Sequence, residues 1–160
     1  AILPDKLLPQ MLAAKHATDI SSAGITQRSF DLYLREGLWE KHLYEMRKLF
    51  KKRFKVMEET INKELLSSAD LIYKPKGGLY FWLKLQNKYS SEKLYKKSLE
   101  KGVAFLPGSL FYHDNRESNK FRLSFAASNE EEIKRGIKIL AKNIKEIQAN
   151  SKNKGYTPLL

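Results

Sequence analysis

One arginine stands on a predicted strand where it could bind an anion. In the segment NKFRLSFAAS, the apolar residues Phe121, Leu123 and Phe125 alternate with Arg122, which therefore points to the opposite face of the strand. A guanidinium group binds a carboxylate through two parallel, charge-assisted hydrogen bonds, a geometry that lysine lacks. Alternation alone favours a plainer interpretation, in which Arg122 is an exposed residue on the solvent side of a sheet.

Other residues that could do chemistry do not form a recognisable site. The three histidines, His16, His42 and His113, are far apart and lack metal-ligand spacing, so we expect no metal site. A triad of Ser109, His113 and Asp114 can be written, but no nucleophile elbow surrounds the serine. We interpret the histidine and aspartate as part of a surface loop. The carboxylates fall mostly in helix caps and helix faces, and none of them suggests a catalytic pair.

Composition favours one domain, or a small domain with a remnant of another. The chain has 160 residues, of which 42% are hydrophobic, and it contains no cysteine, which excludes disulfides and thiol catalysis. No apolar run approaches the roughly 20 residues that a membrane span needs, and no signal peptide is recognisable. We therefore expect a cytoplasmic protein without membrane association. The first residue is alanine, so we also expect the chain to be part of a longer protein.

The chain is strongly basic, with a formal net charge of +12. The densest block is Arg47–Lys55, RKLFKKRFK, which has six basic residues in nine. Such a charge permits binding to nucleic acid or to another anion. However, no interleaved aromatic platform and no DNA-reading motif accompanies the block. We interpret it as the solvated face of an amphipathic helix.

Three helices are predicted in the first part of the chain. One covers residues 5–19, and a shorter one opens at Thr26 or Ser29 and is interrupted by Gly37. A long helix over residues 40–66 follows, about 40 Å in length at about 1.5 Å per residue. Its apolar residues recur every three or four positions: Leu43, Met46, Phe50, Phe54, Met57, Ile61 and Leu65.

An α+β layer is predicted beyond the long helix. Strands over Leu71–Tyr73 and Leu79–Leu85 flank the turn Pro75–Gly78 and form a hairpin. The Gly-Gly pair in this turn lacks the rest of a phosphate-binding loop. A helix capped by Ser90 or Ser91 and closed by Gly102 is predicted next. Two strands follow, one over Val103–Leu106 that is ended by Pro107-Gly108, and one over Lys120–Ala126. The last predicted helix begins at the capping box Ser128–Glu131 and runs to about Ala149.

Four segments taken together resemble a known family. In order and spacing, GGLYFWLKL, GVAFLPGSLFY, FRLSFA and NEEEIKRGIKILAKNI resemble the C-terminal part of the class I/II aminotransferases, which are pyridoxal 5'-phosphate (PLP) enzymes of fold type I. Residues 2–34 resemble the segment after the catalytic lysine of that family. The resemblance is strongest to the aminotransferase-like domain of GntR/MocR-type transcriptional regulators, which join this domain to a winged helix-turn-helix.

The resemblance implies a fold and a division of the chain. We expect a small, mostly antiparallel sheet that is covered by helices and preceded by a long linking helix. Residues 1–40 would be a remnant of the large PLP-binding domain, residues 41–149 the small C-terminal domain, and residues 150–160 a flexible tail.

The resemblance also implies roles for individual residues. Arg122 matches the arginine that holds the carboxylate of an amino-acid substrate or effector. Ser22 and Thr26 fall in a loop near the partner subunit's cofactor phosphate in a homodimer. No lysine in this chain matches the Schiff-base lysine, and the aspartate and phosphate-binding residues are also expected upstream. We therefore expect the fragment alone to bind no PLP and to be inactive.

Three functional interpretations follow. The leading one is the C-terminal part of a PLP-binding effector domain in a GntR/MocR-type regulator, which binds an amino acid or another carboxylate ligand and contacts DNA through a separate N-terminal domain. The alternative is a fragment of a genuine amino-acid aminotransferase. The third is a basic α+β binding module without a cofactor.

Overall fold

The computed structural model describes residues 3–19, 23–86, 89–114 and 116–153, and the backbone alone over 151–153. The chain divides into two compact units, Ala1–Met46 and Arg47–Leu160. Each unit is described by itself. The predicted boundary between a large-domain remnant and a small domain, after residue 40, stays a prediction.

The first unit is helical. A 3-10 turn η1 (Asp5–Leu7) leads into α1 (Leu8–Thr18), and α2 (Gly24–Arg35) follows. Gly37 separates α2 from the next helix with a φ of 67°, as its predicted role as an interruption requires. The second helix begins earlier than Thr26, because the carbonyl oxygen of Ala23 already accepts a hydrogen bond from the N–H of Gln27 at 3.2 Å.

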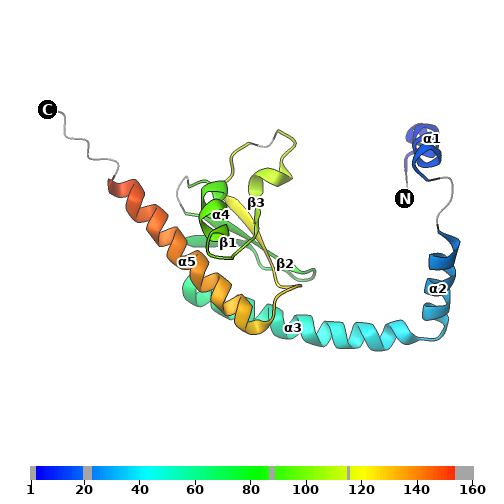
Figure 1. Cartoon of the computed structure of the whole chain (residues 1–160), viewed down its shortest axis with the longest axis horizontal. Coiled ribbons are helices and arrows are strands. Elements are labelled where there is room, and N and C mark those ends of the chain that lie inside the picture. Colours follow the sequence, from blue (N-terminus) through cyan, green and yellow to red (C-terminus); the bar gives the residue numbers. More distant parts are fainter. Residues whose placement is uncertain (1–2, 20–22, 87–88, 115, 154–160) are drawn as a thin grey trace. The chain divides into compact units, whose positions relative to one another are not determined.

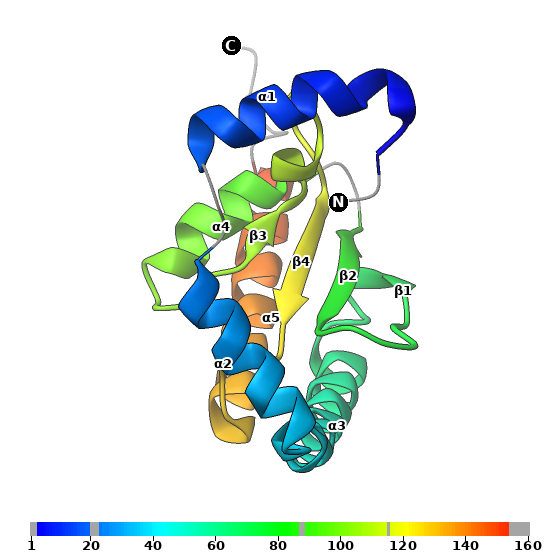
Figure 2. The same ribbon diagram turned by 90° about the vertical axis from the view of Figure 1, so that its right-hand side faces the viewer.

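The long helix α3 (Leu38–Glu64) leads into the second unit, which is an α+β layer. All three strand pairings in its four-stranded sheet are antiparallel, in the order β1-β2-β4-β3 (Figure 2). This confirms the predicted fold class. The remaining elements of the unit are β1 (Ala69–Tyr73), β2 (Tyr80–Leu85), α4 (Ser91–Leu99), β3 (Leu106–Pro107), η2 (Gly108–Phe111), β4 (Lys120–Ser124) and α5 (Glu130–Asn153).

The hydrophobic core lies between one face of the sheet and the helices. Figure 1 shows α5 and the C-terminal half of α3 on the same side of the sheet. Phe81 and Phe125 are at most 2% exposed, and Phe54 of α3 stacks on Phe81 with ring centroids 5.1 Å apart. Ile137 and Ile144 of α5 are also buried. Burial of this apolar area, at about 25 cal/mol per Å², fixes which face of the sheet stays open.

The predicted strand over Val103–Leu106 is wrong in its extent. The strand β3 consists of Leu106 and Pro107 alone, and Pro107 pairs with Phe121 of β4. Proline was expected to end this strand. Because β3 is an edge strand, the missing N–H of proline costs no hydrogen bond within the ladder.

The predicted capping box at the last helix is shifted by one residue. Asn129 Oδ1 accepts the N–H of Glu132 at 2.9 Å, and the carboxylate of Glu132 accepts the N–H of Asn129 at 2.9 Å. The reciprocal pair is therefore Asn129 and Glu132, and not Ser128 and Glu131. The helix itself continues to Asn153, beyond the predicted end near Ala149.

The described residues contain neither a candidate membrane span nor a cluster of potential metal ligands. No helix among them has the length and apolar character to cross a bilayer. No group of three or more potential metal ligands gathers anywhere in the part of the chain that the structure describes.

Candidate functional site

Arg122 lies in the middle of the open face of the sheet. It belongs to β4, where its strand partners are Trp82 on one side and Leu106 on the other. Its chain neighbours Phe121 and Leu123 are buried, on the core side. The alternation read from the sequence therefore places the Arg122 side chain correctly, on the face of the sheet opposite the buried Phe121 and Leu123.

Aromatic rings hold this guanidinium in place. Its central carbon lies 3.9 Å from the ring centroid of Tyr80 and 5.1 Å from that of Phe111. Trp82 braces Phe111 from the side, with ring centroids 5.0 Å apart and an interplanar angle of 90°. Stacking against rings favours the cation and restricts its motion. It leaves the N–H groups at the edge of the guanidinium plane able to donate to a ligand.

Arg122 has no carboxylate partner within the described part of the chain. The ion pairs recorded there involve other basic residues, among them Arg116 with Asp114 and Arg35 with Asp31. An arginine held by rings and left without a counter-ion is suited to bind a carboxylate from outside. The aromatic frame thus argues against an ordinary solvent-exposed arginine.

The turn η2 positions Phe111 through a close packing at Gly108. A Cβ atom at this glycine would lie 2.5 Å from Ser118 Oγ and 2.6 Å from the carbonyl oxygen of Lys120. The hydroxyl of Ser91 donates to the carbonyl oxygen of Ser118 at 2.8 Å and accepts the Gly108 N–H at 3.4 Å. The turn is therefore fixed against the start of β4, two residues before Arg122.

The carboxylate of Glu92 is held by serine hydroxyls near the same turn. Burial raises the pKa of Glu92, but hydrogen bonds from Ser109, Ser90 and Ser91 outweigh it and lower the pKa below its ordinary value of 4.5. Ser109 is thus engaged with Glu92, and no catalytic triad with His113 is supported.

Changing Glu92→Gln is expected to destabilise the protein at pH 7 and to matter less at pH 3. Because the folded-state pKa of Glu92 is lowered, its ionised form contributes stability above the unfolded pKa, and that contribution is lost as pH falls through the folded pKa. We expect a loss of about 0.5–1 kcal/mol at pH 7, measured by urea unfolding at both pH values. The control Glu117→Gln removes an exposed carboxylate, and at pH 7 it should cost less stability than Glu92→Gln. An equal loss at both pH values for Glu92→Gln would contradict the assignment.

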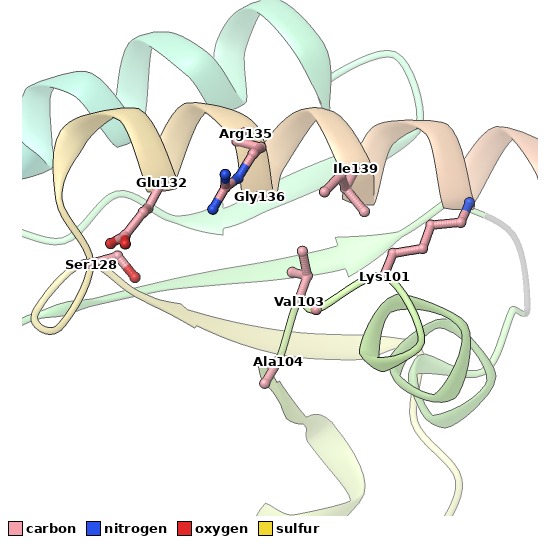
Figure 3. A pocket seen from close by; sticks show the side chains of 9 residues that line it. Lys101, Val103, Ala104, Ser128, Glu132, Arg135, Gly136 and Ile139 are labelled. Carbon is pink, nitrogen blue, oxygen red and sulfur yellow. The ribbon is translucent and has the colours of Figure 1, made fainter.

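A groove on the other side of this unit offers less chemistry. It has a volume of about 600 Å³ and lies between α5 and the segment that carries Val103 and Ala104 (Figure 3). Two of its polar side chains serve packing: Lys101 donates to Asn143 Oδ1 at 2.6 Å, and Glu132 caps α5. We assign no ligand to this groove.

The other two predicted site residues are not joined to Arg122. Ser22 lies outside the described residues. Thr26 lies exposed in the first turn of α2, within the first unit. Their place near a cofactor phosphate stays a prediction.

The aromatic frame was not predicted from sequence. The sequence predicts the strand Leu79–Leu85 without assigning its faces, but Tyr80 and Trp82 alternate with the buried Phe81 and so share the face of Arg122. That alternation was the available signal. Phe111 gave no signal, because its position depends on the folding of η2.

A family model matches most of the chain. The model for aminotransferase class I and II covers residues 10–140. The chain belongs to the class I and II aminotransferase family. This confirms the resemblance that the four sequence segments carry, and it places the open face with Arg122 within an aminotransferase fold.

The chain is similar both to an aminotransferase and to a transcriptional regulator. The 2-aminoadipate transaminase of Thermus thermophilus is 28% identical over 149 residues, which are 93% of this chain and 37% of that protein. YdfD of Bacillus subtilis, an uncharacterised helix-turn-helix-type transcriptional regulator, is 28% identical over 144 residues, 90% of this chain and 29% of that protein. The chain thus spans well under half the length of these relatives.

A solved aminotransferase structure has the same fold. The crystal structure of LysN, an α-aminoadipate aminotransferase of Thermus thermophilus complexed with N-(5'-phosphopyridoxyl)-L-leucine, has a TM-score of 0.79 at 27% identity. The match covers 92% of this chain and 38% of that one.

The residues around Arg122 fit a ligand carboxylate and do not fit PLP itself. The recorded neighbours of the guanidinium are the rings of Tyr80 and Phe111, and these include neither an amine for a Schiff base nor a carboxylate for a pyridine nitrogen. We therefore assign no PLP contact to the rings around Arg122.

Proposed function

We propose that the chain is the C-terminal part of a PLP-binding, aminotransferase-like effector domain of a GntR/MocR-type transcriptional regulator. In this proposal, Arg122 binds the carboxylate of an amino acid or a related ligand. The observation that carries the proposal is the guanidinium stacked 3.9 Å from Tyr80, with no ion-pair partner among the described residues.

The chemistry of the site supports recognition and not bond making. Arg122 can orient a carboxylate through two hydrogen bonds, and the rings of Tyr80 and Phe111 exclude water from one side of the guanidinium. PLP, when bound by the longer protein, supplies the electron sink of amino-acid chemistry. Of the two rings described beside Arg122, only Tyr80 carries an ionisable hydroxyl, and we assign it no acid or base role.

The regulator interpretation rests on similarity to proteins such as YdfD, which is called a transcriptional regulator. Under the regulator interpretation, a separate N-terminal domain of the full-length protein contacts DNA, and the protein acts as a homodimer. A genuine aminotransferase is the second candidate, because the similarity to 2-aminoadipate transaminase is of the same extent. A cofactor-free binding module would explain the charge, but it does not explain the family membership.

Cofactor binding separates these candidates. We expect the full-length protein that contains this chain to show the visible absorbance band of protein-bound PLP, whereas the 160-residue chain alone should show none. A full-length protein without the band would overturn both leading candidates.

The second measurement distinguishes a regulator from an enzyme. DNA binding by the PLP-loaded full-length protein should change when an amino acid is added, and 2-oxoglutarate should not be converted to glutamate. Steady conversion with no DNA binding would favour the aminotransferase.

A further inference from the structure

A second hollow lies within the Arg47–Leu160 unit, between α3 and the turn that joins β1 to β2. Its volume is about 580 Å³, which is in the range of about 300–1,000 Å³ typical of small-molecule sites. Arg122 does not line it. We call it the α3 groove; its lining residues are Arg47, Phe50, Lys51, Phe54, Pro75, Lys76, Gly77, Gly78, Leu79 and Phe125.

The floor of the α3 groove is formed by packed aromatic rings. Phe125 meets Phe50 edge-on at 6.4 Å and Phe54 at 5.9 Å between ring centroids. Phe125 is 2% exposed, and the two rings from α3 are half-buried. An apolar group placed on this floor would be removed from water against side chains that are already packed.

The rim of the α3 groove is cationic. Arg47 and Lys51 stand one helical turn apart on α3, and Lys76 comes from the turn opposite. Among the described lining residues there is no carboxylate, and none of these three cations takes part in a recorded ion pair. Like charges four residues apart on a helix destabilise it, so an anion between them would be favourable.

The basic residues of the block Arg47–Lys55 have two kinds of surroundings: some are paired with other parts of the protein, and others line the α3 groove. Lys52 pairs with Glu130 at 3.0 Å, and Arg53 donates to the carbonyl oxygen of Ala126 at 2.5 Å. Arg47 and Lys51 instead share one face of α3 with the two phenylalanines of the floor. The block is therefore more than a uniformly solvated helix face.

We propose that the α3 groove binds a small organic anion with an apolar body: the body rests on the aromatic floor, and its carboxylate lies between Arg47, Lys51 and Lys76. The charge complementarity of the rim and the apolar floor together select this class of ligand. The proposal does not depend on the role proposed for Arg122.

The probe for this proposal is 4-phenylbutyrate, titrated by calorimetry into the full 160-residue chain. All measurements use an Arg122→Gln background, so that no carboxylate can bind at that arginine. We expect saturable binding, and binding of the uncharged 4-phenylbutyramide should be weaker by about tenfold. Ring-current shifts of the Leu79 methyl resonances should place the phenyl group in the groove.

Two matched double variants each remove two positive charges from α3, one pair inside the α3 groove and one pair outside it. The double change Arg47→Gln and Lys51→Gln should weaken binding by about tenfold, whereas Lys48→Gln with Lys55→Gln, which removes two exposed lysines outside the groove, should change it less than about twofold. The charge-preserving double change Arg47→Lys and Lys51→Arg should retain binding.

Three results would overturn the proposal: equal binding of the amide, equal loss in both glutamine doubles, or no saturable binding of the acid. An equal loss of affinity in both double variants would mean that the overall positive charge of the chain, and not the groove, attracts the anion.

Discussion

Replacing Arg122 with glutamine is expected to weaken binding of a carboxylate ligand about 30-fold in the PLP-loaded, full-length protein. The change removes a charge-assisted pair of hydrogen bonds worth about 2 kcal/mol, and about 1.4 kcal/mol corresponds to tenfold in affinity. PLP absorbance should be unchanged, because the residues around Arg122 offer no hold on the cofactor. Ligand titration followed by absorbance or calorimetry measures both quantities in one sample.

Two further variants make this result specific. Arg122→Lys keeps the charge but lacks the planar fork, so it should recover only part of the affinity. Arg116 is the matched control, since its guanidinium also stacks on a ring, at 4.1 Å from the centroid of Tyr112. Arg116→Gln should leave ligand affinity unchanged. If Arg116→Gln and Arg122→Gln reduced affinity equally, the effect would come from the change in net charge. That result would contradict the assignment of Arg122 as the carboxylate site.

The position of Arg122 was predictable because strand alternation is a local property. Once Phe121 and Leu123 are known to be apolar, the side chain between them has to point to the other face. The ring frame could not be predicted in the same way. It depends on the register that places Trp82 opposite Arg122 and on the turn that delivers Phe111, and both are set by long-range contacts.

The errors in the predicted secondary structure also arise where local sequence does not decide between alternatives. Both Ser128 and Asn129 can cap a helix, and each has a glutamate three residues later, so the sequence permits two registers of the capping box. The structure uses Asn129 with Glu132. For Pro107, local propensity predicts the end of a strand, whereas the edge position of β3, known only from the complete sheet, allows proline within it.

Changing Gly108→Ala is expected to destabilise the protein by about 1–3 kcal/mol and to disturb the site. The added methyl group would meet the backbone oxygen of Lys120 at 2.6 Å, and a backbone atom in a paired strand cannot move aside cheaply. The turn η2 would have to shift, and with it Phe111, which lies on both Arg122 and Trp82. Urea unfolding measures the first effect, and Trp82 fluorescence in a Trp39→Phe background reports the second.

The control for this change is Gly77→Ala, in the turn between β1 and β2. A Cβ atom at Gly77 meets nothing within 4 Å, and its φ lies outside the positive range, so stability should change by less than about 0.5 kcal/mol. In the full-length protein, Gly108→Ala should also lower the affinity of the Arg122 site for a carboxylate, because the guanidinium loses one of its two rings. If Gly108→Ala cost stability but left affinity and Trp82 fluorescence unchanged, η2 would absorb the methyl group without moving Phe111. The aromatic frame would then owe its geometry to the strand pairing alone.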